Sequence, residues 1–140
     1  MSVPARCMIP HRIATDLISQ CRARLPYEAC GVLLGIRTEE ELTVESYCLL
    51  RNVAADPRIS FRFAPDEWIR LNLRTQKNQR EIVGLWHSHP SGPALPSAQD
   101  AEGWDGCGSY WIIGLEGCRT DIRAYAGSGG EWIPIPLIAV

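Results

Sequence analysis

The sequence predicts an α+β protein in which a mixed β-sheet is flanked by two longer helices and one short helix. Two segments, 11–25 and 65–79, have the residue spacing and end signals of amphipathic helices. Short apolar or alternating segments bounded by turn residues run between and after them, which is typical of strands. At 140 residues the chain suits one domain, 1–140, that is large enough to bury a core.

The first half of the chain begins with a helix and continues as a hairpin. Residues 11–25 place apolar side chains at helical spacing, and Pro26 ends the helix because its ring cannot continue the hydrogen-bond ladder. Residues 30–37 and 42–50 are apolar runs separated by an acidic turn, so we expect them to pair as a hairpin. Residues 60–63 alternate in polarity and predict a further strand.

A second helix and a strand with a polar end follow. Pro65 and the two acidic residues after it begin the helix, which runs to about residue 79. Proline fits the first helical turn, and acidic side chains stabilise the positive end of the helix dipole. Residues 81–89 read EIVGLWHSH, an apolar run with a polar end, and predict a strand.

The last third of the chain is expected to be mostly strand. Ser97 begins a short helix, because serine is a favoured N-cap residue. Residues 109–115 and 121–126 predict two strands joined by a turn. The extended end, 131–138, contains two prolines, which cannot donate to a sheet ladder and therefore fit only an edge strand. This apolar edge is compatible with a homodimer.

The composition excludes several classes of function. Hydrophobic residues make up 46% and charged residues 21% of the chain, as in ordinary globular proteins. A formal net charge of −2, without basic runs interleaved with aromatic residues, disfavours nucleic-acid binding. No segment approaches a membrane span, and the first residues lack a secretory signal, so we expect a cytoplasmic protein with no membrane partner. The six cysteines are then expected to be reduced thiols.

The stretch HSHPSGPALPSAQD carries the chemistry of the sequence. His87 and His89 are two apart on a predicted strand, so both imidazoles point to the same face and can reach one ion, while Ser88 points away. The turn-rich segment that follows sends the chain back toward the strand end. Asp100 then sits in the first turn of the helix begun by Ser97. The spacing predicts a metal site formed by the two histidines and the aspartate.

Each of these residues also has an ordinary structural explanation. Ser97 and Asp100 match the capping signature Ser-x-x-Asp, and this role is compatible with metal binding by the aspartate. A histidine pair on a surface is more often solvated than liganded. Two of the three histidines of the chain lie in the tripeptide His87-Ser88-His89, and a carboxylate on the predicted helix follows them. Their occurrence together favours metal binding over a solvated histidine pair. Three protein ligands leave a fourth position for water, as in hydrolytic zinc sites, although the same donors can hold iron or manganese.

The stretch resembles the signature of the JAMM metallopeptidases, the catalytic branch of the MPN-domain proteins. That signature is His-x-His, seven residues, Ser, two residues and Asp, and this chain agrees at every step. The segment PYEACGVLLG, at residues 26–35, and later segments are also similar, so that the resemblance covers roughly residues 10–138. It implies an MPN fold, which has a cytidine deaminase-like layered arrangement.

The resemblance also implies roles for the residues. His87, His89 and Asp100 would bind Zn²⁺, Glu28 would be the general base, and Ser97 would stabilise the oxyanion. Without the resemblance, Glu28 would be taken for a solvated glutamate beside a turn. The implied reaction is hydrolysis of a peptide or isopeptide bond, at the C-terminal Gly-Gly tail of a ubiquitin-like or sulfur-carrier protein.

Two other classes of protein share parts of this pattern. A non-catalytic MPN scaffold has the same fold but lacks metal ligands, whereas all of them are present here. A RadC-like, DNA-repair-associated relative has a similar HSHPSG motif, but an N-terminal helical DNA-binding module is expected there and has no room before His11. A nucleobase deaminase is excluded because neither His-x-Glu nor Pro-Cys-x-x-Cys occurs.

Overall fold

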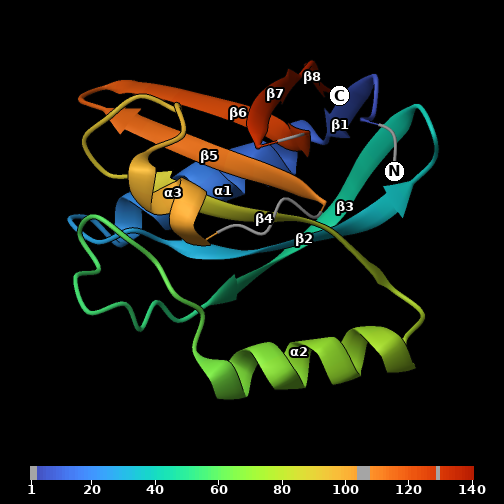
Figure 1. The fold of residues 1–140 in the computed structure, drawn as a ribbon, viewed down its shortest axis with the longest axis horizontal. Helices are drawn as coiled ribbons and strands as arrows, with labels where there is room; N and C mark the ends of the chain where they lie inside the picture. The colour runs from blue at the N-terminus through green and yellow to red at the C-terminus, as the bar shows by residue number, and fades with distance from the viewer. Residues whose placement is uncertain (1–2, 104–107, 129) are drawn as a thin grey trace.

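The structure is a computed structural model that describes residues 3–103, 108–128 and 130–140 (Figure 1). The described residues form three helices and eight strands. In chain order these are β1 (Arg6–Ile9), α1 (His11–Ala23), β2 (Cys30–Arg37), β3 (Glu41–Leu50), α2 (Pro65–Lys77), β4 (Glu81–His89), α3 (Ala98–Gly103), β5 (Ser109–Glu116), β6 (Arg119–Ser128), β7 (Glu131–Ile135) and β8 (Leu137–Ala139).

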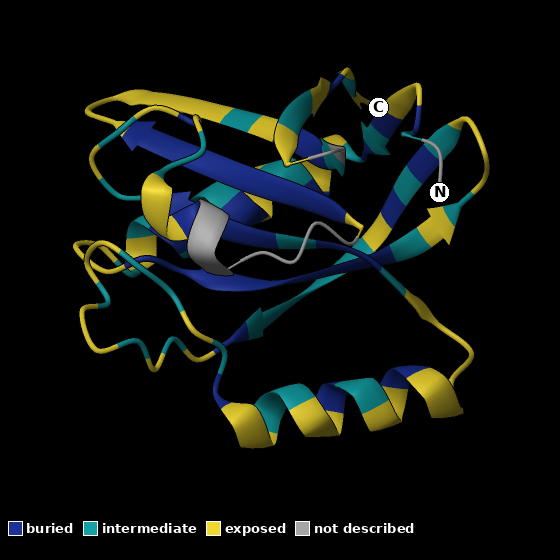
Figure 2. Ribbon diagram, viewed as in Figure 1, coloured by how far each residue is buried: buried dark blue, intermediate teal, exposed yellow. Residues whose placement is uncertain are grey.

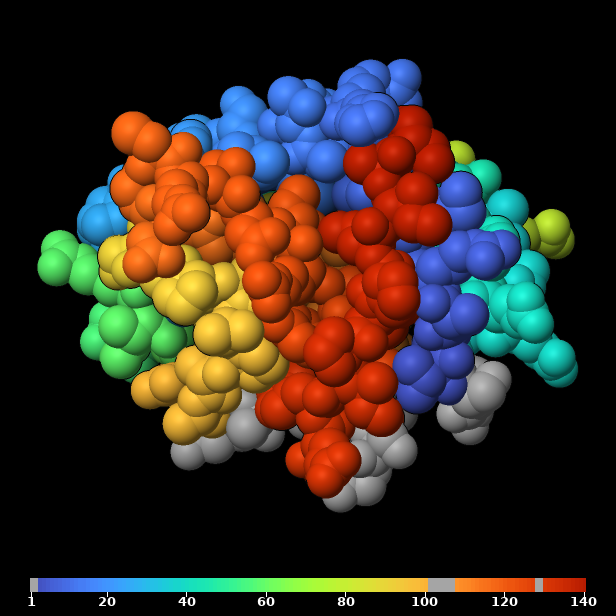
Figure 3. Space-filling model, turned by 90° about the horizontal axis from the view of Figure 1, so that it is seen from above, coloured from blue at the N-terminus to red at the C-terminus, as the bar shows by residue number. Residues whose placement is uncertain are grey.

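All eight strands belong to one mixed sheet with the order β7-β6-β5-β4-β2-β3-β1-β8. The β4–β5, β1–β3 and β1–β8 pairs are parallel, and the other neighbours are antiparallel. The two edge strands, β7 and β8, are consecutive in the chain and only Pro136 separates them. The sheet must therefore curl until its edges meet, and Figure 3 shows the red C-terminal strands against the blue N-terminal segment.

The two longer helices pack on opposite faces of this sheet. Ile13 and Leu17 of α1 share a buried cluster with Leu33 of β2. Val32, the neighbour of Leu33, instead belongs to a second buried cluster that contains Leu71 of α2. Successive side chains of a strand point to opposite faces, so β2 is covered on both sides. Figure 2 shows the buried central strands and, on α2, an exposed outer face.

The fold prediction is confirmed in its class and in most of its elements. The hairpin of β2 and β3 is antiparallel, and the two prolines near the end of the chain lie in or beside the edge strands. Trp86 packs in the cluster that contains α1, on the face opposite His87. No helix among the described residues is both long and apolar enough to cross a membrane.

Three details differ from the sequence-based expectations. The helices end at Ala23 and Lys77, a turn or less before their predicted ends. The four residues of β1 were not predicted, because so short a strand carries little periodicity. Residues 60–63 form no strand, and their ladder is reduced to one antiparallel bridge between Asn52 and Phe63. The backbone of that segment pairs with residues 51–53, which follow the end of β3 and lie outside the sheet.

Candidate metal centre

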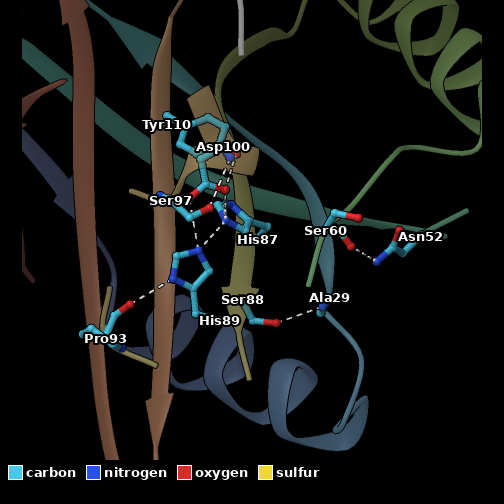
Figure 4. Close-up of polar contacts among 10 residues, drawn as sticks. All are labelled: Ala29, Asn52, Ser60, His87, Ser88, His89, Pro93, Ser97, Asp100 and Tyr110. Atoms are coloured by element: carbon cyan, nitrogen blue, oxygen red, sulfur yellow. Dashed lines mark hydrogen bonds and ion pairs between the residues drawn. The ribbon is translucent and has the colours of Figure 1, made fainter. Parts of the chain in front are cut away.

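Two histidines and an aspartate converge at the carboxyl end of β4 (Figure 4). The Nε2 atom of His87 lies 2.8 Å from Oδ1 of Asp100, and Nε2 of His89 lies 3.2 Å from Oδ2. The two Nε2 atoms are 3.0 Å apart. The histidines share a face because they are two residues apart on a strand, and α3 presents the aspartate from across the intervening turn.

The backbone around the site fixes the orientation of two of these side chains. Nδ1 of His89 lies 2.9 Å from the carbonyl oxygen of Pro93, so it must carry the proton and donate it. In the neutral form of His89, the Nε2 atom therefore keeps a lone pair for a ligand. Asp100 Oδ2 accepts a hydrogen bond from the Ser97 backbone N–H at 2.7 Å, and Ser97 Oγ accepts one from the Asp100 N–H at 3.2 Å. The expected capping arrangement is present.

Aromatic side chains that the sequence did not single out enclose the histidines. Tyr110, on β5, donates a hydrogen bond from its hydroxyl to Asp100 Oδ1 at 3.1 Å, and its ring centroid lies 5.0 Å from that of His87. Phe61, in the loop between β3 and α2, stacks on His87 with the two ring centroids 4.7 Å apart. The neighbouring strand β5 was predicted, but its register against β4, which brings Tyr110 to Asp100, cannot be read from a single sequence.

Ser88 joins the histidine strand to the start of β2. Its side chain points away from the two imidazoles, as strand alternation predicts, and its Oγ accepts a hydrogen bond from the Ala29 N–H at 2.8 Å (Figure 4). The Ser88 N–H donates in return to the Ala29 carbonyl at 2.9 Å. In the next pair of the ladder, Cys30 lies opposite His87. These contacts bring Glu28, which is distant in sequence, to the edge of the candidate metal centre.

Glu28 is buried, with 5% of its surface exposed, and it lines a pocket of about 210 Å³ together with His89 and Ser97. Its Oε1 atom is buried and has no hydrogen-bond partner among the described residues. Burial raises the pKa of Glu28 to about 8; nearby His89 acts to lower this pKa, and Asp100 acts to raise it. The side chain can therefore exchange a proton near neutral pH.

The three converging residues differ in their electrostatics. Complete burial lowers the pKa of His87, which favours the neutral imidazole. Burial acts to lower the pKa of His89 as well, but hydrogen bonds to Asp100 and to the Pro93 carbonyl outweigh it and raise this pKa. Burial acts to raise the pKa of Asp100, yet the hydrogen bonds from both histidines hold it well below its usual range. These hydrogen bonds thus favour the carboxylate form of Asp100.

This arrangement fits a divalent cation. One ligand atom from each of His87, His89 and Asp100 lies within 4.8 Å of the other two. The set offers imidazole nitrogens and a carboxylate oxygen, which zinc and related metals accept. Glu28 lies near enough to interact electrostatically with His89 and Asp100, and its buried Oε1 has no hydrogen-bond partner among the described residues, which costs free energy.

Comparisons with known proteins agree with this site. The family model described as prokaryotic homologs of the JAB domain matches residues 10–126. The chain is 36% identical over 109 residues to a protein of Haloferax volcanii named desampylase, spanning 76% of this chain and 74% of that one. It is 30% identical over 112 residues to a probable TtuB-protein conjugate cleaving protease of Thermus thermophilus, spanning 77% and 72%.

The fold has a close match among solved structures. The solution structure of protein DSY2949 from Desulfitobacterium hafniense superposes with a TM-score of 0.85 at 29% identity, over 96% of this chain and 92% of that one. The resemblance to the JAMM and MPN proteins is thereby confirmed. The chain belongs to the prokaryotic JAB-domain family, as a compact JAMM/MPN member.

Proposed function

We propose that this chain is a zinc-dependent JAMM-type isopeptidase that releases a ubiquitin-like or sulfur-carrier protein from its conjugates at a C-terminal Gly-Gly tail. The observation that carries the proposal is the placement of a buried carboxylate, Glu28, in one pocket with His89, a member of the candidate metal cluster of His87, His89 and Asp100. The names of the relatives, desampylase and conjugate cleaving protease, support the choice of substrate.

His87, His89 and Asp100 would hold the zinc ion. When bound, zinc supplies Lewis acidity, which polarises a carbonyl oxygen and lowers the pKa of water. Three protein ligands leave a position for solvent or substrate, as catalytic zinc sites require. The carboxylate of Asp100 and two neutral imidazoles would leave the site with a net positive charge once the ion is present.

Glu28 would be the general base and then the general acid. It would take a proton from the attacking water and return it to the leaving amine. Positive charge nearby lowers the pKa of a carboxyl group, so the loaded site would bring Glu28 from a pKa of about 8 to an ionised state at neutral pH. Its burial keeps the basicity higher than that of a hydrated carboxylate.

Ser97 would stabilise the oxyanion of the tetrahedral intermediate. Its Oγ accepts the hydrogen bond from the Asp100 N–H, and among the described residues no acceptor takes its hydroxyl proton. That O–H lines the same pocket as Glu28 and His89 and is free to donate there. A hydroxyl aimed at a developing negative charge in a dry site contributes up to a few kcal/mol.

The size of the pocket favours a tail of small residues. At about 210 Å³, and bordered by Ser91 and Gly92, it suits an extended chain whose last residues have no bulky side chain. A Gly-Gly tail meets this requirement. Its free backbone groups could pair with the protein by strand addition. The free cysteines among the described residues favour a reducing, cytoplasmic compartment, where such carriers would be met.

The proposal is tested with a carrier protein joined through its terminal glycine to the ε-amine of a lysine peptide. The zinc-loaded protein should release the peptide, and a chelator should stop the reaction until zinc is returned. Separate loading with iron or manganese would show whether zinc is the preferred ion. Absence of cleavage by protein that contains one zinc ion per chain would contradict the proposal and favour a non-catalytic scaffold.

A further inference from the structure

We propose that Asn52 is a positioning residue that holds Glu28, and the loop that covers it, in the geometry for proton transfer. This inference rests on the proposed function, because it assigns Asn52 a role through the general base. It stands on a set of hydrogen bonds that lies outside the metal ligands.

The side-chain amide of Asn52 both donates and accepts hydrogen bonds. Its Nδ2 donates to the carbonyl oxygens of Glu28 and Ser60, each at 3.0 Å. Its Oδ1 accepts from the backbone N–H of Ala54 at 3.0 Å and of Arg62 at 3.1 Å. One half-buried side chain therefore joins Glu28, two residues before β2, to both arms of the loop that follows β3. Figure 4 shows its contact with Ser60.

Glu28 depends on this loop for its place. Its backbone N–H donates to the Pro57 carbonyl at 2.7 Å, and its carbonyl accepts from Asn52. Both backbone groups of Glu28 are thus satisfied by the segment 52–60 and not by a neighbouring strand. The side chain adds little restraint, because Oε1 has no partner among the described residues. The orientation of the carboxylate follows from the backbone that Asn52 holds.

The same loop also forms a wall of the pocket. Arg58 and Ile59, which lie between the two loop arms held by Asn52, line the pocket with Glu28 and His89. Loss of the Asn52 amide would leave two backbone carbonyls and two N–H groups without their partner, and the loop would move relative to Glu28. None of the four hydrogen bonds involves His87, His89 or Asp100. The loop meets the cluster through the stacking of Phe61 on His87 and not through these hydrogen bonds, so metal affinity should change much less than kcat.

Asn52→Ala is expected to lower kcat by about 10- to 100-fold, since a displacement on the order of 1 Å of a reacting group has an effect of that size. KM and zinc affinity should stay within about threefold of the parent values. Asn52→Asp keeps the shape and the acceptor but loses both donated hydrogen bonds, so it should behave like the alanine variant. It provides a second test if the alanine variant does not fold.

Asn72→Ala is the matched control. Asn72 lies on α2, and its Nδ2 also donates to a backbone carbonyl, that of Trp68, at 2.8 Å. This hydrogen bond has no connection to Glu28. The control variant should therefore leave kcat unchanged, although it too loses a hydrogen bond from an asparagine side chain to a backbone carbonyl and is expected to be less stable.

A double-mutant cycle separates positioning from a general structural role. When Glu28 has been replaced by glutamine, there is no base left to position, so adding Asn52→Ala should lower the residual single-turnover rate by less than about threefold. If the Asn52 effect is equally large in both backgrounds, or if zinc affinity falls with it, the positioning role is wrong. If Glu28→Gln alone leaves the rate unchanged, the proposed function fails instead.

Discussion

Replacement of Glu28 by glutamine should stabilise the metal-free protein at alkaline pH and remove its activity when zinc is bound. Only 5% of the surface of Glu28 is exposed, and burial raises the pKa of its carboxyl group from an ordinary 4.5 to about 8. At about 1.4 kcal/mol per pH unit, this difference corresponds to at most about 5 kcal/mol of stability lost when the buried group ionises. Glutamine has similar size and does not ionise.

The pH window follows from the two pKa values. Below pH 4.5 the carboxyl is protonated in both the folded and the unfolded chain. Between pH 4.5 and about 8 the folded state binds more protons than the unfolded state, so stability falls as pH rises. Above this range the loss is complete. The stability of the glutamine variant relative to the parent should therefore increase across that window and then level off.

Urea unfolding of both proteins in the presence of a chelator, at a series of pH values, measures this difference directly. Groups common to both chains, such as His89, contribute to each curve and largely cancel in the comparison. Two parallel curves separated by a constant offset would refute the reasoning, because they would mean that Glu28 is hydrated in the metal-free protein. With zinc bound, the variant should cleave about 10²- to 10⁴-fold more slowly, as expected for loss of a general base.

Three further substitutions test the surroundings of the site. Tyr110→Phe removes the hydroxyl that donates a hydrogen bond to Asp100. Zinc affinity, measured by competitive titration, should fall by about 10- to 100-fold. Unchanged affinity would show that this hydrogen bond does not orient Asp100. Gly31→Ala would place a methyl carbon 1.9 Å from the Cys48 carbonyl oxygen. The free energy of unfolding, measured with denaturant, should therefore fall by about 3 kcal/mol or more. A fall of less than about 1 kcal/mol would contradict the close spacing of β2 and β3. Ser97→Ala removes the N-cap of α3 and should lower the free energy of unfolding by about 1 kcal/mol. It should also lower kcat. A loss of stability with unchanged kcat would mean that Ser97 caps the helix and has no role in catalysis.

The candidate metal cluster of His87, His89 and Asp100 is the part of the site that local sequence predicts well. The relation of His87 to His89 depends only on strand alternation, and that of Ser97 to Asp100 only on the first turn of a helix. Both are short-range geometry. The turn between these segments was sufficient to indicate that they meet, because its prolines and glycine cannot continue the strand.

The remaining parts of the site depend on long-range pairing. Glu28 reaches the pocket because β2 pairs with β4, and Tyr110 reaches Asp100 because β5 pairs with β4 on the other side. Such registers are set by the packed sheet and leave no periodicity in one sequence. Glu28 was found through the family resemblance, and Tyr110 was not found at all. The failure of residues 60–63 to form a strand has the same origin, since a local alternation needs a partner strand to become a ladder.

The proposed chemistry requires one zinc ion held by His87, His89 and Asp100. X-ray absorption at the zinc edge of protein loaded with one equivalent of the metal tests this directly. The predicted spectrum contains only nitrogen and oxygen donors, two of them imidazoles at about 2.0–2.1 Å. Sulfur at about 2.3 Å, which would place the ion on cysteines, or a spectrum without imidazole, would contradict the account.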